Sequence, residues 1–246
     1  MKHSNSIIQQ KGFSLIEMAI VLFIVALLLG GLIPTVSSQM EQQHRSETRK
    51  QLDQIQQALI GFSVMNGRLP CPATLASSGV ESTITPGAGD CTDFFSGYVP
   101  AVTLGLTPVN DKGLLLDGWN NPVRYAVTNK DIALATDAFT SPNGMKTASL
   151  ASIASTSLLL VCSSSTGITA TTCGGTAVKL TDTAPAVIYS LGKNGATVST
   201  DPDELANTNG DIVFVSHDQT STFDDLVVWI SPNILINRMV AAGQLP

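Results

Sequence analysis

An apolar stretch near the start of the chain, from Phe13 to Ile33, constrains the fold more than any other feature of the sequence. As a helix it would be about 31 Å long, which is enough to cross a membrane once. One acid, Glu17, interrupts it close to its beginning. A carboxylate inside a lipid-facing helix costs about 2.5–3.5 kcal/mol, so such a residue usually has a partner. The stretch therefore predicts a single transmembrane helix in which Glu17 needs an explanation.

The composition fits one membrane segment followed by a polar domain. Hydrophobic residues make up 43% of the chain and charged residues only 13%. The net charge of −6 argues against broad electrostatic binding to nucleic acid. Lys2 and Lys11 favour a cytoplasmic N-terminus, but Arg45, Arg49 and Lys50 follow the apolar stretch, so charge alone leaves the orientation open.

The residues offer two explanations of Glu17. If the short polar leader is retained, the acid lies near the end of the helix and reaches the lipid headgroups. If the chain is cut between Gly12 and Phe13, the new α-amino group of Phe13 is a cation close to the acid, in the same subunit or in a neighbour. At low dielectric a pair of opposite charges is strongly favoured over either charge alone.

The order of Gly12, the sequence FSLIE (13–17) and a long apolar helix resembles the N-terminal signature of type IV pilins and type II secretion pseudopilins. This resemblance implies that a prepilin peptidase cuts between Gly12 and Phe13 on the cytoplasmic side and methylates the new amine of Phe13. It also implies that Glu17 pairs with the N-terminus of an adjacent subunit during filament assembly. Pro34 stands where many of these proteins have a proline that kinks the helix.

The expected fold is α+β: a long N-terminal helix, with a transmembrane half and an amphipathic half, packed on a β-rich globular domain with an antiparallel sheet. The expected parts are a cytoplasmic leader (1–12), the helix (13–62, transmembrane over 13–33) and a periplasmic or extracellular domain (63–246). Runs rich in β-branched residues predict strands at 123–127, 157–162, 186–192, 211–217 and 225–231. Ser231 and Pro232 predict the start of a last helix.

A turn is predicted before the first of these strands, within LLLDGWNNPVRYAV (114–127). The passage resembles the DxWGxPxxY passage that leads into the sheet of major pseudopilins. The resemblance implies that Trp119 and Tyr125 are core residues. Asn120 stands where that pattern has glycine.

The four cysteines fall in two local pairs, Cys71 with Cys91 and Cys162 with Cys173. Of the three possible connectivities, the local one is favoured because each pair brackets a turn-rich loop. A zinc site is the alternative, but CxxC spacing is absent and none of the three histidines is close in sequence to a pair. Disulfides imply an oxidising compartment, which places the domain in the periplasm or outside the cell.

The segment SLGKNGATVSTDPDELANTNGDI (190–212) is rich in side chains that carry oxygen. Calcium takes six to eight oxygen ligands, whereas turn formation alone would also explain Asp, Asn and Gly here. The passage resembles the pseudopilin loop in which SLGxDG precedes an acidic calcium-binding segment, with Asn194 in place of the acid. Composition alone favours turn formation, so no cofactor is expected. The resemblance makes calcium the alternative, with Asp201, Asp203 and Asp211 as candidate ligands.

Catalysis is not indicated by the sequence. It has no GxSxG, Walker A or HExxH motif. Ser216, His217 and Asp218 are adjacent, but neighbouring strand residues point to opposite faces and cannot form a triad by themselves.

The expected function is that of a structural subunit, a pilin or pseudopilin, of a type IV pilus or type II secretion filament. The expected location is the bacterial inner membrane and then the filament. The expected partners are other pilin or pseudopilin subunits, the prepilin peptidase and the inner-membrane assembly platform. The alternatives are a minor or tip pilin with an adhesive or DNA-capture role, and a membrane-anchored periplasmic binding domain.

Overall fold

The computed structural model describes residues 12, 14–132, 136–147 and 156–245, with the backbone but not the side chains of residues 29–36. The chain divides into two compact units, Met1–Gln43 and His44–Pro246. The leader up to residue 11, Phe13 and the side chain of Pro34 lie outside the described residues.

Helix α1 begins at Leu15 and ends at Asn66, so it continues past its expected end at residue 62. In the first unit its large apolar side chains between Leu15 and Leu28 are exposed, from 43% at Val25 to 93% at Leu15. Within the residues that the structure describes, no helix is long and apolar enough to cross a membrane. The predicted transmembrane segment, 13–33, extends into residues whose side chains are not among them.

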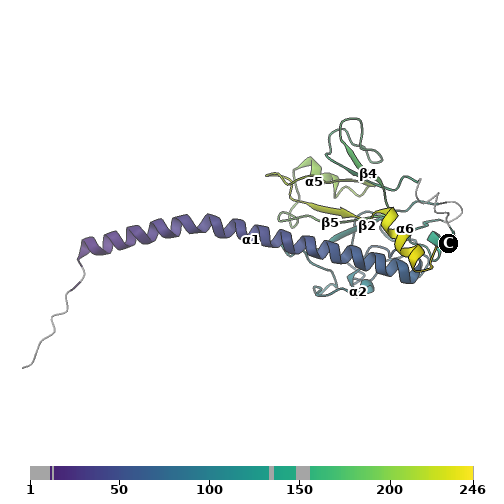
Figure 1. Cartoon of the computed structure of the whole chain (residues 1–246), viewed down its shortest axis with the longest axis horizontal. Helices are drawn as coiled ribbons and strands as arrows, with labels where there is room; N and C mark the ends of the chain where they lie inside the picture. The colour runs from purple at the N-terminus through teal and green to yellow at the C-terminus, as the bar shows by residue number, and fades with distance from the viewer. Residues whose placement is uncertain (1–11, 13, 133–135, 148–155, 246) are drawn as a thin grey trace, which may run out of the picture. The chain divides into compact units, whose positions relative to one another are not determined.

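The second unit is built in three layers (Figure 1). One layer consists of α1 from His44 onward and the last helix, α6 (Pro232–Ala241). The middle layer is an antiparallel sheet in the order β1 (Gly97–Tyr98), β2 (Arg124–Val127), β5 (Ala186–Ser190) and β7 (Leu226–Trp229). The third layer is a sheet in the order β4 (Lys179–Ala184), β3 (Leu159–Cys162) and β6 (Val213–Val215). Short helices α2 (Ala101–Leu104), α3 (Gly144–Thr147) and α5 (Pro202–Ala206) complete the described elements.

The middle sheet is buried on both faces. Tyr125 pairs with Ile188 and joins the core that contains Leu52 of α1. The next pair, Ala126 with Val187, belongs to the core shared with the third layer. Because side chains alternate along a strand, only a sheet covered on both sides produces continuous apolar runs such as that of β5.

The five expected strands correspond to β2, β3, β5, β6 and β7, and the expected last helix corresponds to α6. An antiparallel sheet is confirmed for the middle layer, but β3 and β6 pair in parallel in the third layer. Strands β1 and β4 and helix α5 were not expected. The start of β4, at Lys179 and Leu180, is exposed because it lies at a sheet edge, so it lacks the apolar run of the buried strands.

Both cysteine pairs form disulfides with the local connectivity, Cys71 with Cys91 and Cys162 with Cys173. The structure contains no free cysteine. The first disulfide belongs to the core between α1 and the middle sheet, and the second to a smaller core next to the third layer. The zinc alternative is therefore excluded for these four residues.

The turn that precedes β2 docks on α1. Thr48 Oγ1 accepts a hydrogen bond from the backbone N–H of Gly118 (2.9 Å), and Gln51 Nε2 donates to the carbonyl of Leu116 (2.9 Å). These contacts bring the turn so close to the helix that only glycine fits at position 118.

Asn120 in this turn has a φ of 65°, in the left-handed region that glycine and asparagine tolerate best. This explains why asparagine can stand where the pseudopilin pattern has glycine. Tyr125 is fully buried, as expected. Trp119 is only partly buried and lies against the ring of His44, with 5.9 Å between the ring centroids, so its expected place in the core was wrong.

Replacing Gly118 with alanine should destabilise the second unit, because the new Cβ would lie 2.5 Å from the carbonyl oxygen of His44. Overpacking of this kind costs about 1–3 kcal/mol, and each kcal/mol lowers Tm by about 2–4 °C in a protein of this size. Thermal unfolding monitored by circular dichroism measures the change.

Gly61→Ala is the matched control, since a Cβ at this position in α1 meets no atom within 4 Å outside the helix's own nearby backbone. Alanine is favoured over glycine in a helix by about 0.5–1 kcal/mol, so this variant should raise Tm. A Gly118→Ala protein as stable as the Gly61→Ala protein would show that the turn does not need this close approach.

Candidate functional site

The first candidate site is the N-terminal signature. Glu17 Oε2 accepts a hydrogen bond from the backbone N–H of Ser14 (2.8 Å), and Ser14 Oγ accepts one from the backbone N–H of Glu17 (3.2 Å). This reciprocal pair is a capping box, which satisfies donors at a helix start that have no partner within the helix. Glu17 therefore has a partner in its own subunit that the sequence reasoning missed, although the Ser-x-x-Glu spacing could have predicted it.

Of the other residues of the signature, the structure describes Gly12 and the backbone of Pro34. Gly12 is exposed and precedes the helix. Phe13, and with it the predicted cleavage and methylation, lies outside the described residues. Pro34 falls within α1, but its side chain is not described.

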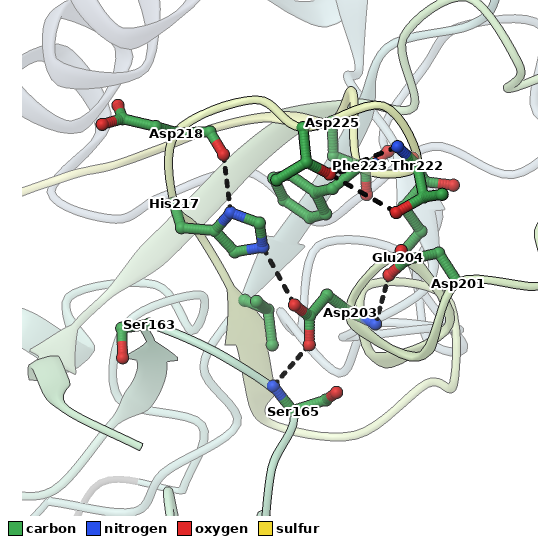
Figure 2. Close-up of polar contacts among 12 residues, drawn as sticks. Ser163, Ser165, Asp201, Asp203, Glu204, His217, Asp218, Thr222, Phe223 and Asp225 are labelled. Atoms are coloured by element: carbon green, nitrogen blue, oxygen red, sulfur yellow. Dashed lines mark hydrogen bonds and ion pairs between the residues drawn. The ribbon is translucent and has the colours of Figure 1, made fainter.

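The second candidate site is a group of three acids in the second unit, and Figure 2 labels two of them, Glu204 and Asp225. Glu204 lies on α5, and Asp224 and Asp225 immediately precede β7. One carboxylate oxygen of each lies within 4.8 Å of the others. Glu204 is 2% exposed and Asp225 is 5% exposed, so two of the three acids are buried.

The hydrogen bonds to the two buried acids, Glu204 and Asp225, come from neutral groups. Glu204 accepts from Asn194 Nδ2 (2.7 Å) and from the backbone N–H of Asp224 (2.8 Å). Asp225 Oδ2 accepts from Asn207 Nδ2 (2.8 Å), whereas its Oδ1 is buried without a hydrogen-bond partner among the described residues. Removing a carboxylate from water is costly unless it is paired with a positive charge or protonated.

This environment raises the pKa of Asp225 to about 8. Burial is the main cause, the negative charges of Glu204, Asp224 and Asp201 add to it, and the hydrogen bond from Asn207 opposes it. At neutral pH such a carboxyl group keeps its proton or binds a cation in place of it.

A cavity of about 200 Å³ lies beside Glu204 and Asp225. Asn194, Thr197 and Ser199 also line it, and their oxygen atoms are ligands of the type that hard cations such as calcium prefer. The unpartnered oxygen of Asp225 and the two neighbouring acids form a group that could hold a divalent cation. Arg124 also lines the cavity and places a positive charge near Glu204 and Asp225.

The three acids predicted from the sequence as ligands have other contacts. Asp201 caps α5 by accepting from the backbone N–H of Asp203 (2.8 Å). Asp203 accepts from the backbone N–H of Ser165 (2.6 Å) and lies 2.9 Å from His217 Nε2. Asp211 accepts from the backbone at the start of β6 (2.8 Å). The structure thus brings together different acids from those predicted, and calcium binding itself stays a prediction.

His217 does not form part of a catalytic triad with its neighbours in sequence. Its Nε2 meets the Asp203 carboxylate and its Nδ1 lies 2.7 Å from the carbonyl oxygen of Asp218 (Figure 2). Both ring nitrogens therefore have partners, and neither partner is a serine or threonine hydroxyl. Burial alone would raise the pKa of Asp203, but the hydrogen bonds from Ser165 and His217 outweigh it and lower that pKa.

Comparison with known proteins bears on the first site. The prokaryotic N-terminal methylation motif matches residues 8–33, and this motif is the signature of type IV pilins and pseudopilins. The match includes Gly12, Phe13 and Glu17 but no residue of the second unit. Searches of curated proteins and of solved structures found no significant match. The motif therefore supports a pilin-like or pseudopilin protein, a family of structural proteins.

The raised pKa of Asp225 predicts a pH dependence of stability when divalent cations are removed by a chelator. The ordinary pKa of an aspartate is 3.8, and that of Asp225 in the folded protein is about 8. Between these two pH values, the folded state holds the proton of Asp225 more tightly than the unfolded state does. The contribution of Asp225 is therefore most favourable below the ordinary pKa and is lost as the pH rises through about 8. Asp225→Asn keeps an acceptor for Asn207 but cannot ionise, so its Tm relative to wild type should increase from pH 4 to pH 8. A difference in Tm that does not vary with pH would contradict the assignment.

Proposed function

We propose that the chain is a structural subunit of a type IV pilus or type II secretion filament, made as a single-pass precursor in the bacterial inner membrane. The observation that carries this proposal is the methylation motif at residues 8–33. A prepilin peptidase would cut between Gly12 and Phe13 and methylate Phe13, and the assembly platform of the inner membrane would add the mature subunit to the filament.

The first unit supports this proposal through its apolar surface. The side chains of α1 from Leu15 to Leu28 are exposed in the isolated chain. A helix that is apolar on all sides needs lipid or other apolar helices around it. Lipid would cover it in the membrane before assembly, and neighbouring subunits would cover it in the filament. The two disulfides of the second unit suit the periplasm or the cell exterior.

Within this proposal Glu17 has two partners. Ser14 caps the helix through one oxygen of the carboxylate. A carboxylate accepts several hydrogen bonds, so the methylated amine of Phe13 in a neighbouring subunit can add to the bond from Ser14 without replacing it. The capping box would keep the carboxylate at the helix start, next to the position where the amine of another subunit arrives.

Mass spectrometry of the intact chain from native membranes or sheared filaments tests the processing step. The proposal expects a mature chain that starts at N-methylated Phe13. A chain that keeps Met1 in cells with an active prepilin peptidase would contradict it and would leave an ordinary membrane-anchored domain.

Two substitutions of Glu17 separate the roles of charge and capping. Glu17→Gln keeps a side chain that a capping box accepts but removes the charge, whereas Glu17→Ala removes both. If the pairing between subunits drives assembly, both variants should be inserted and cleaved, and both should give a much lower yield of sheared filaments. A normal yield from Glu17→Gln with a low yield from Glu17→Ala would assign the role to capping, and normal yields from both would refute a role in assembly.

We also propose that the second unit binds one calcium ion at the cluster of Glu204, Asp224 and Asp225. The ion would bind between the carboxylates and offset the repulsion between their negative charges. Asn194, Thr197 and Ser199 of the neighbouring cavity offer further oxygen ligands. Asp225 is the strongest single argument, because its side chain is buried and one of its oxygens has no hydrogen-bond partner among the residues described.

Calcium should raise the Tm of the full chain in detergent micelles, by the equivalent of about 2.7 kcal/mol at a free concentration of 100 times Kd. Asp225→Asn should abolish this stabilisation. Asp211→Asn removes an acid of the same region that lies outside the cluster, so it should leave the stabilisation largely intact. Loss of the effect in Asp211→Asn but not in Asp225→Asn would instead favour the ligands predicted from the sequence.

A further inference from the structure

The acids of the proposed calcium site come from two segments of the chain that must be held together. Glu204 lies on α5, and Asp224 and Asp225 end the connection 216–225 between β6 and β7. Two links between these parts, Asp224 N–H to Glu204 and Asn207 to Asp225, use the carboxylates of the site itself. The contact between His217 and Asp203 joins the same segments without using those carboxylates.

Each nitrogen of the His217 ring faces an oxygen atom. Nδ1 lies 2.7 Å from the backbone carbonyl oxygen of Asp218. Nε2 lies 2.9 Å from a carboxylate oxygen of Asp203. The ring therefore bridges the backbone of the connection and a side chain of α5.

The ring is also fixed in orientation. It stacks on Phe223, with 3.9 Å between the ring centroids and 26° between the planes. Phe223 is 1% exposed and directly precedes the two acids of the connection. The ring thus contacts Phe223, the residue next to Asp224, and also Asp203 of α5.

The other charged groups around the ring are mostly acidic. Arg49, Asp53 and Asp225 line the same cavity of about 280 Å³ as His217. Asp203 faces the ring from α5, and Asp218 follows it in sequence.

We propose that His217 is a positioning residue of the calcium site: bonded to Asp203 and Asp218 and stacked on Phe223, it fixes the carboxylates of Asp224 and Asp225 opposite Glu204. This inference rests on the proposed calcium site. Groups that orient metal ligands without touching the metal typically change affinity by about 10–100-fold when they are removed.

Replacement of His217 tests the positioning role. His217→Gln removes the stacked ring and its contact with Asp203. Any positive charge on the ring would oppose a second cation, so loss of charge alone would not weaken calcium binding. If His217 positions the ligands, calcium should bind about 10-fold more weakly. Isothermal titration of the full chain in detergent with calcium chloride, after treatment with a chelator, measures the two Kd values. An unchanged or lower Kd in the variant would overturn the proposal.

A second pair of variants covers the case in which His217→Gln does not fold. Asp203→Asn weakens the bridge, whereas Asp218→Asn removes a nearby negative charge but keeps the backbone carbonyl that His217 contacts. Both lose one acid, so general electrostatics predicts similar small losses of affinity. Positioning predicts a clearly larger rise of Kd for Asp203→Asn, and equal effects would overturn it.

Nuclear Overhauser contacts between the ring protons of His217 and Phe223 separate this inference from the calcium site. The calcium-free wild-type protein should show them because the two rings stack, and their absence would contradict the placement of the ring. If the wild type shows these contacts but binds no calcium, then the calcium site is refuted and the positioning role with it, while the packing of His217 on Phe223 stands.

Discussion

The burial of the middle sheet on both faces is the constraint on which the rest of the second unit depends. Leu52, Ile55 and Leu59 of α1 cover one face, and the third layer covers the other through Val161 and Phe214. Neither cover is large, and a two-sided sheet exposed on one side would present a continuous apolar surface to water. The same packing fixes the position of β5 and the start of β7, and therefore where Asp224 and Asp225 meet α5. The proposed calcium site is a product of this layered arrangement.

The two candidate sites place acids in opposite situations. Glu17 is exposed in the isolated chain and bonded to its neighbour Ser14, so its charge remains available to a second partner. Glu204 and Asp225 are buried and accept hydrogen bonds from neutral donors, so each is protonated or has its charge compensated within the domain. The exposed acid suits an interaction between chains, and the buried acids suit an interaction that stabilises a single chain.

The sequence predicted most of the described framework because its signals are local. Strands β2, β3, β5, β6 and β7 are runs of apolar or β-branched residues, and Ser231-Pro232 marks the start of α6. The parallel pairing of β3 and β6 was missed, since nothing local records which strands meet. Strand β4 was missed because an edge strand carries polar residues such as Lys179.

The cluster of Glu204 with Asp224 and Asp225 was missed for a related reason. Its members lie in separate segments of the sequence and are brought together by the positions of β6 and β7 in the fold. The partial exposure of Trp119 depends on how the turn docks on α1, which residue types alone do not encode.

Strand β4 has a consequence for the proposed filament, in which many copies of the chain would lie close together. An unpaired sheet edge is a template to which another chain can add a strand, and neighbouring copies would then associate without order. The edge at β4 begins with the exposed Lys179, which forms an ion pair with Asp182, and its pairing with β3 is irregular at Val161. A charge and an irregular register both discourage such additions. In the proposed filament, these features would keep the sheets of neighbouring copies from joining, and ordered association would use other surfaces of the molecule.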